Sequence, residues 1–246
     1  MRQTIKDKEY FEFAIEDRSS YIKQFEEHIA ANNPAVADWA YVYRQLFSWQ
    51  LSLFFLKYSM GESASDLKDL ALSAIKNYLT AENHQTGNPE AIKLYVGIYN
   101  DALRLASLAI IYEAPDLLEQ LRSSFEKNKK GNDLLLDVLF VNGLGEGSIS
   151  KKLCYPKIFG DLLPLAENDK ITAEIALKNY LDGWYNKMKK TEWYNLHKQS
   201  KVNGASPFYG YWAIEAAAFV KIFKLDGQLF KDYEYFPFGL LEESKP

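Results

Sequence analysis

Glu215 is the residue of this sequence whose surroundings most suggest chemistry. At helical spacing its neighbours between Tyr211 and Phe219 are alanine, isoleucine, tryptophan and phenylalanine. A carboxylate in such an apolar setting needs a hydrogen-bond or cationic partner, or its pKa rises. Glu215 is therefore either an active-site acid or a buried carboxylate that ties helices together. The structural interpretation is favoured, because the sequence shows no second acid or base that converges on it.

An enzymatic alternative pairs Glu215 with His197 as acid and base. It requires the two side chains to lie within hydrogen-bonding distance in an open pocket. A Glu215 that is sealed beneath Trp212 and Phe219 would exclude it. We favour a protein that is not an enzyme.

Metal and phosphate sites are not indicated. The three histidines, at positions 28, 84 and 197, are far apart, and no zinc-ligand spacing occurs. The glycine-rich run 143–148 lacks the Lys-Ser/Thr pair of a P-loop and follows no expected strand, so it predicts a connector between helices. Cys154 has no acid–base partner nearby in sequence and is expected to be a packed, inert thiol. We therefore expect no metal and no cofactor.

The segment 184–201 interleaves lysines with aromatic residues, a pattern that can bind single-stranded nucleic acid. A regulator or scaffold that binds nucleic acid through this segment is thus a second alternative. The favoured interpretation is an amphipathic helix end. Its rings face inward, while Lys187, Lys189 and Lys190 remain in water near the helix C-terminus.

Composition narrows the class of protein. The chain has 246 residues, of which 48% are hydrophobic and 25% charged, so it can bury a large core. Its 33 acidic and 29 basic residues give a net charge of −4, which disfavours a nonspecific nucleic-acid binder. No apolar run approaches the ~20 residues that span a bilayer, and the first residues lack the pattern of a secretory leader. We expect a cytoplasmic protein without membrane contact.

Helical periodicity dominates the sequence, and no stretch shows strand-length alternation. Asn33-Pro34 and Asn88-Pro89 read as helix caps followed by a first-turn proline, and Ser63 with Asp66 resembles a capping box. We expect an all-α fold of about nine helices, without a sheet, as an antiparallel bundle or helical stack. Its two helical modules are 1–130, which carries the acidic excess, and 131–246. The expected helices cover about 6–31, 33–60, 63–83, 88–113, 115–127, 134–141, 156–166, 169–190 and 208–224, with an extended tail over 229–241.

The C-terminal pattern resembles the C-terminal module of the PoNi immunity proteins, which partner the PoNe family of bacterial DNase toxins. The resemblance rests on an aromatic helix end, a Gly-Tyr-Trp…Glu-Ala-Ala-Ala motif and an aromatic tail around a proline. The residues are Trp193, His197-Lys198, Gly210-Tyr211-Trp212, Glu215 to Ala218 and Tyr235-Phe236-Pro237-Phe238. The family's usual tail is Tyr-Tyr-Pro-Tyr-Asp-Leu, so this chain lacks two hydroxyls and one carboxylate there.

The N-terminal half is similar to that family's companion module. Tyr58-Ser59-Met60-Gly61 stands where the family carries Tyr-Ser-x-Gly after an apolar helix, and Asp66-Leu67-Lys68 follows in the next helix. The resemblance implies an antitoxin that forms a heterodimer with a DNase used in interbacterial competition. The motif residues Tyr211, Trp212, Glu215 and Pro237 are assigned to architecture.

An acidic helical surface suits such a role. A nuclease needs a positive channel for phosphate, and carboxylates on its inhibitor can occupy that channel and speed the encounter. The candidate contacts around the third expected helix are Glu62, Asp66, Asp69, Glu82 and Glu90. Those on the first expected helix are Glu9, Glu12 and Glu16. The alternative for each is a solvated helix face.

Overall fold

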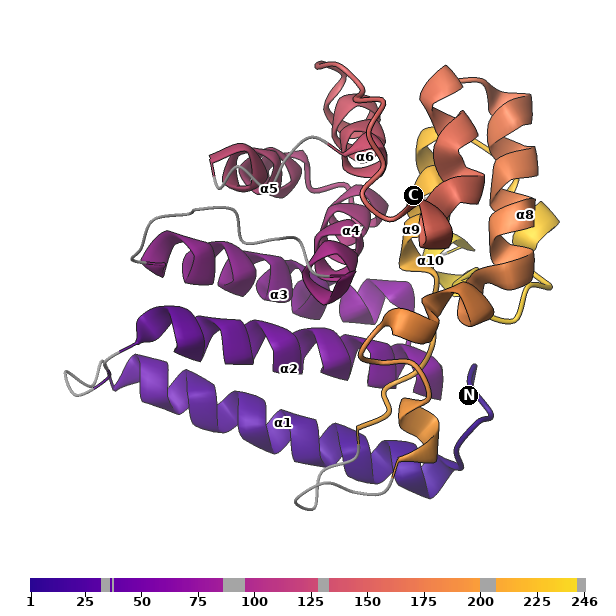
Figure 1. Ribbon diagram of the computed structural model, residues 1–246. Helices are drawn as coiled ribbons and strands as arrows, with labels where there is room; N and C mark the ends of the chain where they lie inside the picture. The colour runs from indigo at the N-terminus through magenta and orange to yellow at the C-terminus, as the bar shows by residue number, and fades with distance from the viewer. Residues whose placement is uncertain (32–35, 37, 86–95, 128–132, 200–206, 243–246) are drawn as a thin grey trace. The chain divides into compact units, whose positions relative to one another are not determined.

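The protein is all-α in the part of the chain that the structure describes. A computed structural model (Figure 1) describes residues 1–31, 36, 38–85, 96–127, 133–199 and 207–242, and no strand occurs among them. The expected fold class is confirmed. The α-helices are α1 Lys8–Ala30, α2 Trp39–Met60, α3 Ala64–His84, α4 Val96–Ile111, α5 Pro115–Lys127, α6 Leu134–Leu144, α7 Pro156–Phe159, α8 Lys170–Lys187, α9 Ile214–Ile222 and α10 Gly239–Glu242. The 3₁₀ helices are η1 Gly160–Glu167, η2 Met188–Lys190, η3 Leu196–Lys198 and η4 Gly227–Phe230.

The helices form two compact units. Unit 1 comprises Met1–Gly87 and Asn195–Tyr211, and unit 2 comprises Asn88–Tyr194 and Trp212–Pro246. The chain therefore passes between the units three times, and a segment from the C-terminal half belongs to the N-terminal unit. Compactness in space and modularity of sequence are different properties, so the sequence modules 1–130 and 131–246 stay a prediction.

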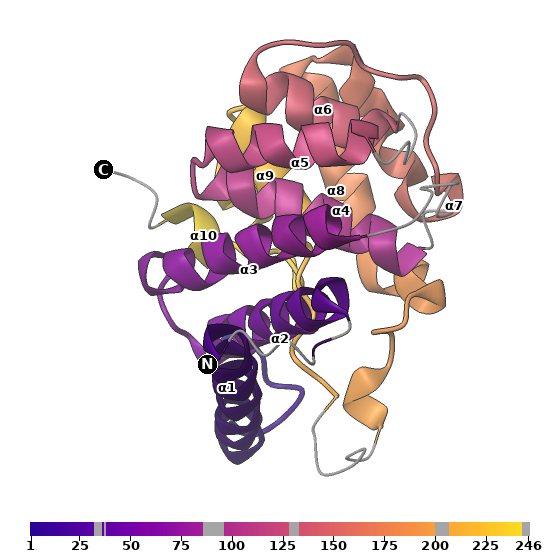
Figure 2. The same cartoon turned by 90° about the vertical axis from the view of Figure 1, so that its left-hand side faces the viewer.

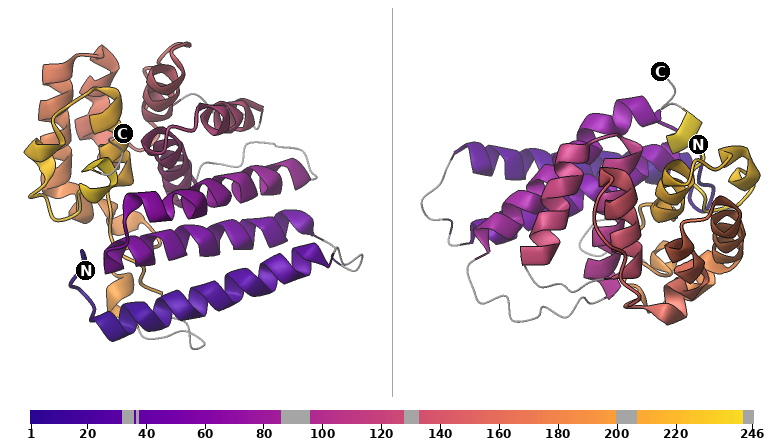
Figure 3. Two further views of the ribbon diagram at one scale, coloured as in Figure 1. Left: turned by 180° about the vertical axis from the view of Figure 1, so that it is seen from behind. Right: turned by 90° about the horizontal axis from the view of Figure 1, so that it is seen from above.

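In unit 1, α2 is the central helix. It packs against α1 on one side and α3 on the other, and the three lie side by side in Figure 1 and, from behind, in the left panel of Figure 3. The sequence requires this, because apolar side chains surround most of α2 and need cover on more than one side. Phe54 and Leu56, for example, are fully buried, whereas α1 buries only a stripe that includes Phe11 and Ala14.

A buried amide fixes how α2 and α3 meet. The Gln50 side chain on α2 accepts a hydrogen bond from the Asn77 amide at 2.8 Å and donates one to the Ser73 hydroxyl at 3.1 Å, both on α3. Gln50 is buried, so a shift of one helix along the other would leave its amide without partners. The register of this helix pair is therefore specified by hydrogen bonding as well as by packing.

The C-terminal end of α2 holds two distant segments of unit 1. Gly61 ends the helix in the left-handed conformation at φ 110°, which turns the chain away and leaves carbonyls open. The Arg2 N–H donates to the Ser59 carbonyl at 2.7 Å, and its guanidinium donates to the Tyr58 and Glu62 carbonyls at 3.0 and 2.6 Å. The Ser59 hydroxyl in turn donates to the Tyr209 carbonyl at 3.4 Å.

In unit 2, α4 and α9 form the interior. α4 packs against α9, α5 and α6, and Figure 2 shows α4, α5 and α6 beside one another. α8 packs along η1 and also contacts α9. Both α4 and α9 are apolar nearly all round, which predicts that neighbours cover them on every side.

The helix caps predicted from the sequence are confirmed in part. The Ser63 hydroxyl accepts from the Asp66 N–H at 3.1 Å, which confirms Ser63 as the N-cap, and it donates to the Asp66 carboxylate at 2.6 Å. The expected Asn33-Pro34 and Asn88-Pro89 caps lie outside the described residues. The described start of α2 is capped by Asp38, whose side chain accepts from the Tyr41 N–H.

Three expected elements differ from the structure. The helix expected over 208–224 begins only at Ile214, because Gly210 adopts φ 108° and residues 207–213 run as non-helical chain. The expected helix 156–166 is a short α-helix followed by 3₁₀ turns, with Pro164 removing one donor inside η1. The tail, expected to be extended, contains η4 and α10 instead.

Two glycines at the ends of helices offer a matched test of backbone strain. Gly145 ends α6 at φ 81° and Gly160 ends α7 at φ −58°, and a Cβ added at either meets nothing within 4 Å. Gly145→Ala should lower the free energy of unfolding by about 1 kcal/mol, because an L side chain is strained in the left-handed region. Gly160→Ala should leave it equal or slightly higher. Urea midpoints of the two variants check this, and equal midpoints would contradict it.

Candidate partner-binding surface

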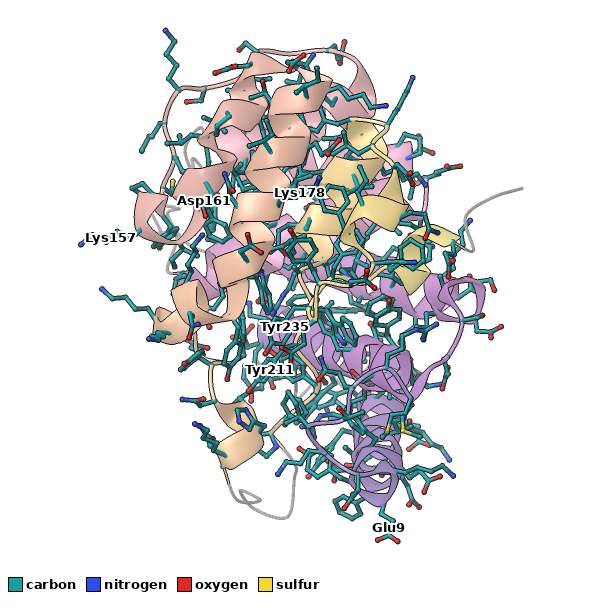
Figure 4. The ribbon with its side chains drawn as sticks, turned by 90° about the vertical axis from the view of Figure 1, so that its right-hand side faces the viewer. Glu9, Lys157, Asp161, Lys178, Tyr211 and Tyr235 are labelled. Carbon is teal, nitrogen blue, oxygen red and sulfur yellow. The ribbon has the colours of Figure 1, made fainter. Side chains whose placement is uncertain are left out.

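Three of the acidic candidates share one exposed face of α1. Glu9, Glu12 and Glu16 fall within an arc of about 60° around the helix, opposite the buried stripe that contains Phe11. All three are exposed, and Figure 4 shows Glu9 projecting away from the ribbon. Glu12 is paired with Lys8 at 2.9 Å, an exposed pair that contributes little to stability.

Phe13 stands beside these carboxylates, and the sequence reading missed it. It is four residues after Glu9 and three before Glu16, and 42% of it is exposed although it is a large aromatic residue. Its position is about 200° around α1 from Phe11. That angle is the sequence signal that could have separated Phe13 from the core stripe. Exposed aromatic residues are typical of protein interfaces.

The acidic candidates of the α3 region do not form a single face. Asp66 and Asp69 are exposed, and the Asp66 carboxylate also accepts a hydrogen bond from the Ser63 hydroxyl. Glu62 is half-buried and lies 3.1 Å from Lys57. Glu82 is sixteen residues beyond Asp66, hence about 160° further around the helix, and it is half-buried. Glu90 lies outside the described residues.

The structure thus places the candidates in two groups within unit 1. The α1 group is Glu9, Glu12 and Glu16, and the α3 group is Asp66 and Asp69. Because α2 lies between α1 and α3, the helix axes that carry them are separated by two packing distances, about 16–20 Å. A partner would have to extend across that layer to touch both groups.

Glu215 is a buried carboxylate that accepts two hydrogen bonds. It is only 5% exposed, and its Oε1 accepts hydrogen bonds from the Tyr180 hydroxyl at 2.6 Å and from the Trp184 indole N–H at 2.8 Å. Burial, and then the charge of Glu215, raise the pKa of Tyr180 well above its ordinary value, so this hydroxyl stays protonated as a donor. These two hydrogen bonds join α9, which carries Glu215, to α8, which carries Tyr180 and Trp184.

His197 has its own partner. Its Nδ1 lies 2.8 Å from the Tyr211 hydroxyl, and its ring meets Phe208 edge-on. Burial, followed by the charges of Lys198 and Lys6, lowers the pKa of His197, so the imidazole is neutral at pH 7. Glu215 and His197 thus have different hydrogen-bond partners, and the burial of Glu215 agrees with its structural interpretation.

The rings of segment 184–199 are used for packing. Trp184 and Trp193 are buried and stacked with ring centroids 5.2 Å apart, and Tyr185 and Tyr194 contact each other at 4.7 Å. Lys187 forms an ion pair with Asp161. Bases of a nucleic acid would have to displace these ring contacts in order to stack, so this segment offers no preformed platform.

The other family-motif residues are also placed in the interior. Tyr211 and Trp212 are buried, and the Tyr211 carbonyl accepts a hydrogen bond from the Gln3 side chain at 3.1 Å within unit 1. Pro237 is buried, and its carbonyl accepts from the Leu240 N–H at 3.0 Å at the start of α10. Their assignment to architecture agrees with these contacts and stays a prediction.

Comparison with protein families covers nearly the whole chain. A model described as "PoNe immunity protein (PoNi), N-terminal" matches residues 2–121, and one described as "PoNe immunity proteins (PoNi), C-terminal" matches residues 131–240. The chain belongs to the PoNe immunity proteins. Membership implies immunity to PoNe nuclease toxins and a PoNe toxin as partner. The resemblance inferred from the sequence motifs is therefore confirmed.

A solved structure shares the fold of this PoNi chain. The crystal structure of protein PA2201 from Pseudomonas aeruginosa aligns with a TM-score of 0.77 at 20% sequence identity, over 98% of this chain and 89% of that one. At this identity the likeness shows a common fold alone. A search of curated proteins found none that matches.

Two classes of site find no support in the described part of this PoNi chain. None of its described helices is long and apolar enough to cross a membrane. Among the same residues, no group of three or more His, Cys, Asp or Glu side chains is arranged to hold a metal ion.

Asp133 is a second buried carboxylate in this PoNi chain, and the sequence reading missed it. It is 1% exposed and accepts hydrogen bonds from the Tyr99 hydroxyl at 2.7 Å and the Cys154 N–H at 2.8 Å. It also caps α6 through the Leu135 and Leu136 N–H groups. The signal was available, because an aspartate directly before an apolar helix predicts an N-cap.

The role of Glu215 can be tested by its hydrogen bonds. Glu215→Leu should lower the free energy of unfolding by roughly 3 kcal/mol, because two buried donors lose their acceptor. Glu215→Gln keeps a carbonyl oxygen at the same place and should cost less than half as much. Chemical denaturation of both variants measures this. Leucine and glutamine variants of equal stability would show that the acceptor does not matter.

The Cys154 thiol should react slowly at neutral pH. Burial, and then the charge of Asp133, raise its pKa to about 11, so its thiolate fraction near pH 8 is on the order of 100-fold below that of a free cysteine. The rate of alkylation by iodoacetamide should keep rising up to about pH 11. Asp133→Asn should accelerate it at pH 8, because a negative charge is removed.

The raised pKa of Cys154 also makes the free energy of unfolding depend on pH. The pKa is higher folded than unfolded, so its contribution to stability is complete below the ordinary thiol pKa and is lost as the pH rises through about 11. A rate plateau below pH 9 in the native protein would overturn both statements.

Proposed function

We propose that this chain neutralises a cognate PoNe-type DNase toxin by binding it directly as a heterodimer and covering its basic DNA-binding site. The proposal includes no catalysis, no cofactor and no direct contact with nucleic acid or membrane. The toxin acts on host DNA, so we place the complex in the cytoplasm of a bacterium engaged in interbacterial competition.

One observation carries this proposal: the face of α1 that presents Glu9, Glu12 and Glu16 together with Phe13. The three carboxylates can meet the positive groups that a nuclease uses for phosphate, and the field they produce speeds the encounter. Phe13 supplies the apolar anchor that charge alone does not, because large aromatic residues dominate interface energies.

The α3 group is the second proposed contact. Asp66 and Asp69 are exposed, whereas Glu62 is engaged with Lys57 and Glu82 faces elsewhere on the helix. We therefore rank Asp66 and Asp69 above Glu62 and Glu82. Glu90 is kept as a sequence-based candidate.

The first experiment is co-expression with a PoNe-type nuclease toxin, beginning with any that is encoded beside this gene. Intact host DNA together with a co-purified stoichiometric complex supports the proposal. Degraded DNA with no complex contradicts it for that pair.

Charge reversal then locates the surface. The association rate is measured with a catalytically inactive form of that toxin. Two variants should associate more slowly, the double variant Glu9→Lys/Glu16→Lys and the single variant Asp69→Lys. For the double variant we expect a decrease on the order of tenfold at low salt. The difference should shrink as salt increases, because exposed charges are screened. Surface plasmon resonance over a salt series measures both rates.

Controls separate binding from folding. Asp69 is preferred to Asp66 because reversal at Asp66 would also remove the hydrogen bond that its carboxylate accepts from Ser63 at the start of α3. Phe13→Ala should act differently, raising the dissociation rate with little effect on association. Unchanged kinetics in all three variants, at unchanged melting temperature, would place the interface elsewhere.

A further inference from the structure

α8 presents two isoleucines to solvent. Ile171 is 72% and Ile175 is 56% exposed, and they are four residues apart on one side of the helix. The buried stripe of α8, centred near Tyr180, lies on the opposite side. Single exposed apolar residues are common, but two branched ones four residues apart on the same side of a helix offer a partner an apolar contact.

The same row of α8 leads into an acidic hollow. Lys178 and Asp182 follow Ile175 within an arc of about 60° around the helix. Asp182 lines a hollow of ≈ 400 Å³ between α8 and the chain before α10. The residues around it are Leu181, Asp182, Asp232, Tyr233, Glu234 and Tyr235. Figure 4 labels Lys178 and Tyr235 on this side of unit 2.

The chemistry of the hollow suits an organic cation. Three carboxylates line it, and Lys178, the nearest base on α8, is already paired with Glu174 at 2.7 Å. Among the described residues no basic side chain forms an ion pair with Asp182, Asp232 or Glu234. The half-buried ring of Tyr233 adds an aromatic side chain of the kind that attracts guanidinium and ammonium groups, whereas Tyr235 is packed against Trp184 and Tyr185. The described acidic groups are not arranged for a metal ion.

We propose that the Ile171–Ile175 row and this acidic hollow form a second docking surface for the toxin. The surface takes a segment that presents an apolar side chain and an Arg or Lys about 10 Å apart, since Ile175 and Asp182 are seven residues apart on a helix. The apolar side chain covers the isoleucines, and the cationic head enters the hollow. This inference rests on the proposed function, which supplies a basic protein as the partner.

Charge complementarity favours the toxin over a second copy of this chain. Residues 167–182 carry Glu167, Asp169, Glu174 and Asp182 against Lys170 and Lys178. A symmetric contact through this face would bring two such acidic rims together, which opposes association. A nuclease surface built to hold phosphate has the opposite charge.

The test measures how tightly four variants bind the catalytically inactive form of the same toxin. Ile171→Lys/Ile175→Lys should weaken binding at least tenfold, mainly through faster dissociation, because the apolar side chain of the toxin loses its contact with the two isoleucines. Asp182→Lys should also weaken it at least tenfold, with a reduced salt dependence. The matched controls are Gln120→Lys and Asp116→Lys on α5, which change exposed residues of unit 2 by the same charge per site and should bind like the wild type.

The outcomes distinguish the two proposals. Wild-type affinity in both α8 variants, with weaker binding by Glu9→Lys/Glu16→Lys, overturns the α8 surface and leaves the proposed function standing. Failure of the wild-type protein to bind the toxin overturns both. Self-association of the wild-type protein that Ile171→Lys/Ile175→Lys abolishes would assign the row to a second copy, which also overturns the inference. Melting temperatures should be unchanged, because all substituted side chains are exposed.

Discussion

The C-terminal end of α2 is the constraint on which unit 1 depends. A helix that is apolar nearly all round must be covered, and its last turn must also dispose of carbonyls that have no partner within the helix. Gly61 turns the chain in the left-handed conformation, and Arg2 caps the Tyr58 and Glu62 carbonyls. Ser59 engages both the N-terminal segment and the returning segment at Tyr209. The Tyr-Ser-x-Gly motif therefore holds the N-terminal segment and the segment at Tyr209 against the end of α2, which is a physical reason for the motif.

Unit 2 uses buried carboxylates for the same purpose. Glu215 gathers Tyr180 and Trp184, and Asp133 gathers Tyr99, Cys154 and the start of α6. A buried charge is tolerated when donors surround it, and each donor then depends on the carboxylate in turn. Glu215, which could be a catalytic acid judged by sequence alone, has its carboxylate hydrogen-bonded to side chains of the core. This agrees with membership of a family of immunity proteins.

The contact surfaces proposed for this chain are all exposed. The α1 face, the α3 pair and the α8 row all combine carboxylates or apolar side chains with exposure, and none needs a deep pocket. That arrangement suits recognition of another protein, where a few exposed anchors with a charged rim provide most of the energy and the speed of encounter.

The sequence by itself determined the all-α class, most helix positions, the Ser63 cap and the family, because these follow from local periodicity, capping chemistry and contiguous motifs. It also singled out Glu215 as buried. It did not reveal that Asn195–Tyr211 joins the N-terminal helices, nor that residues 207–213 are non-helical around Gly210. It could not find the partners of Asp133. Only the tertiary structure decided these, because which side of a helix is covered and which donors reach a carboxylate depend on chain segments that are distant in sequence.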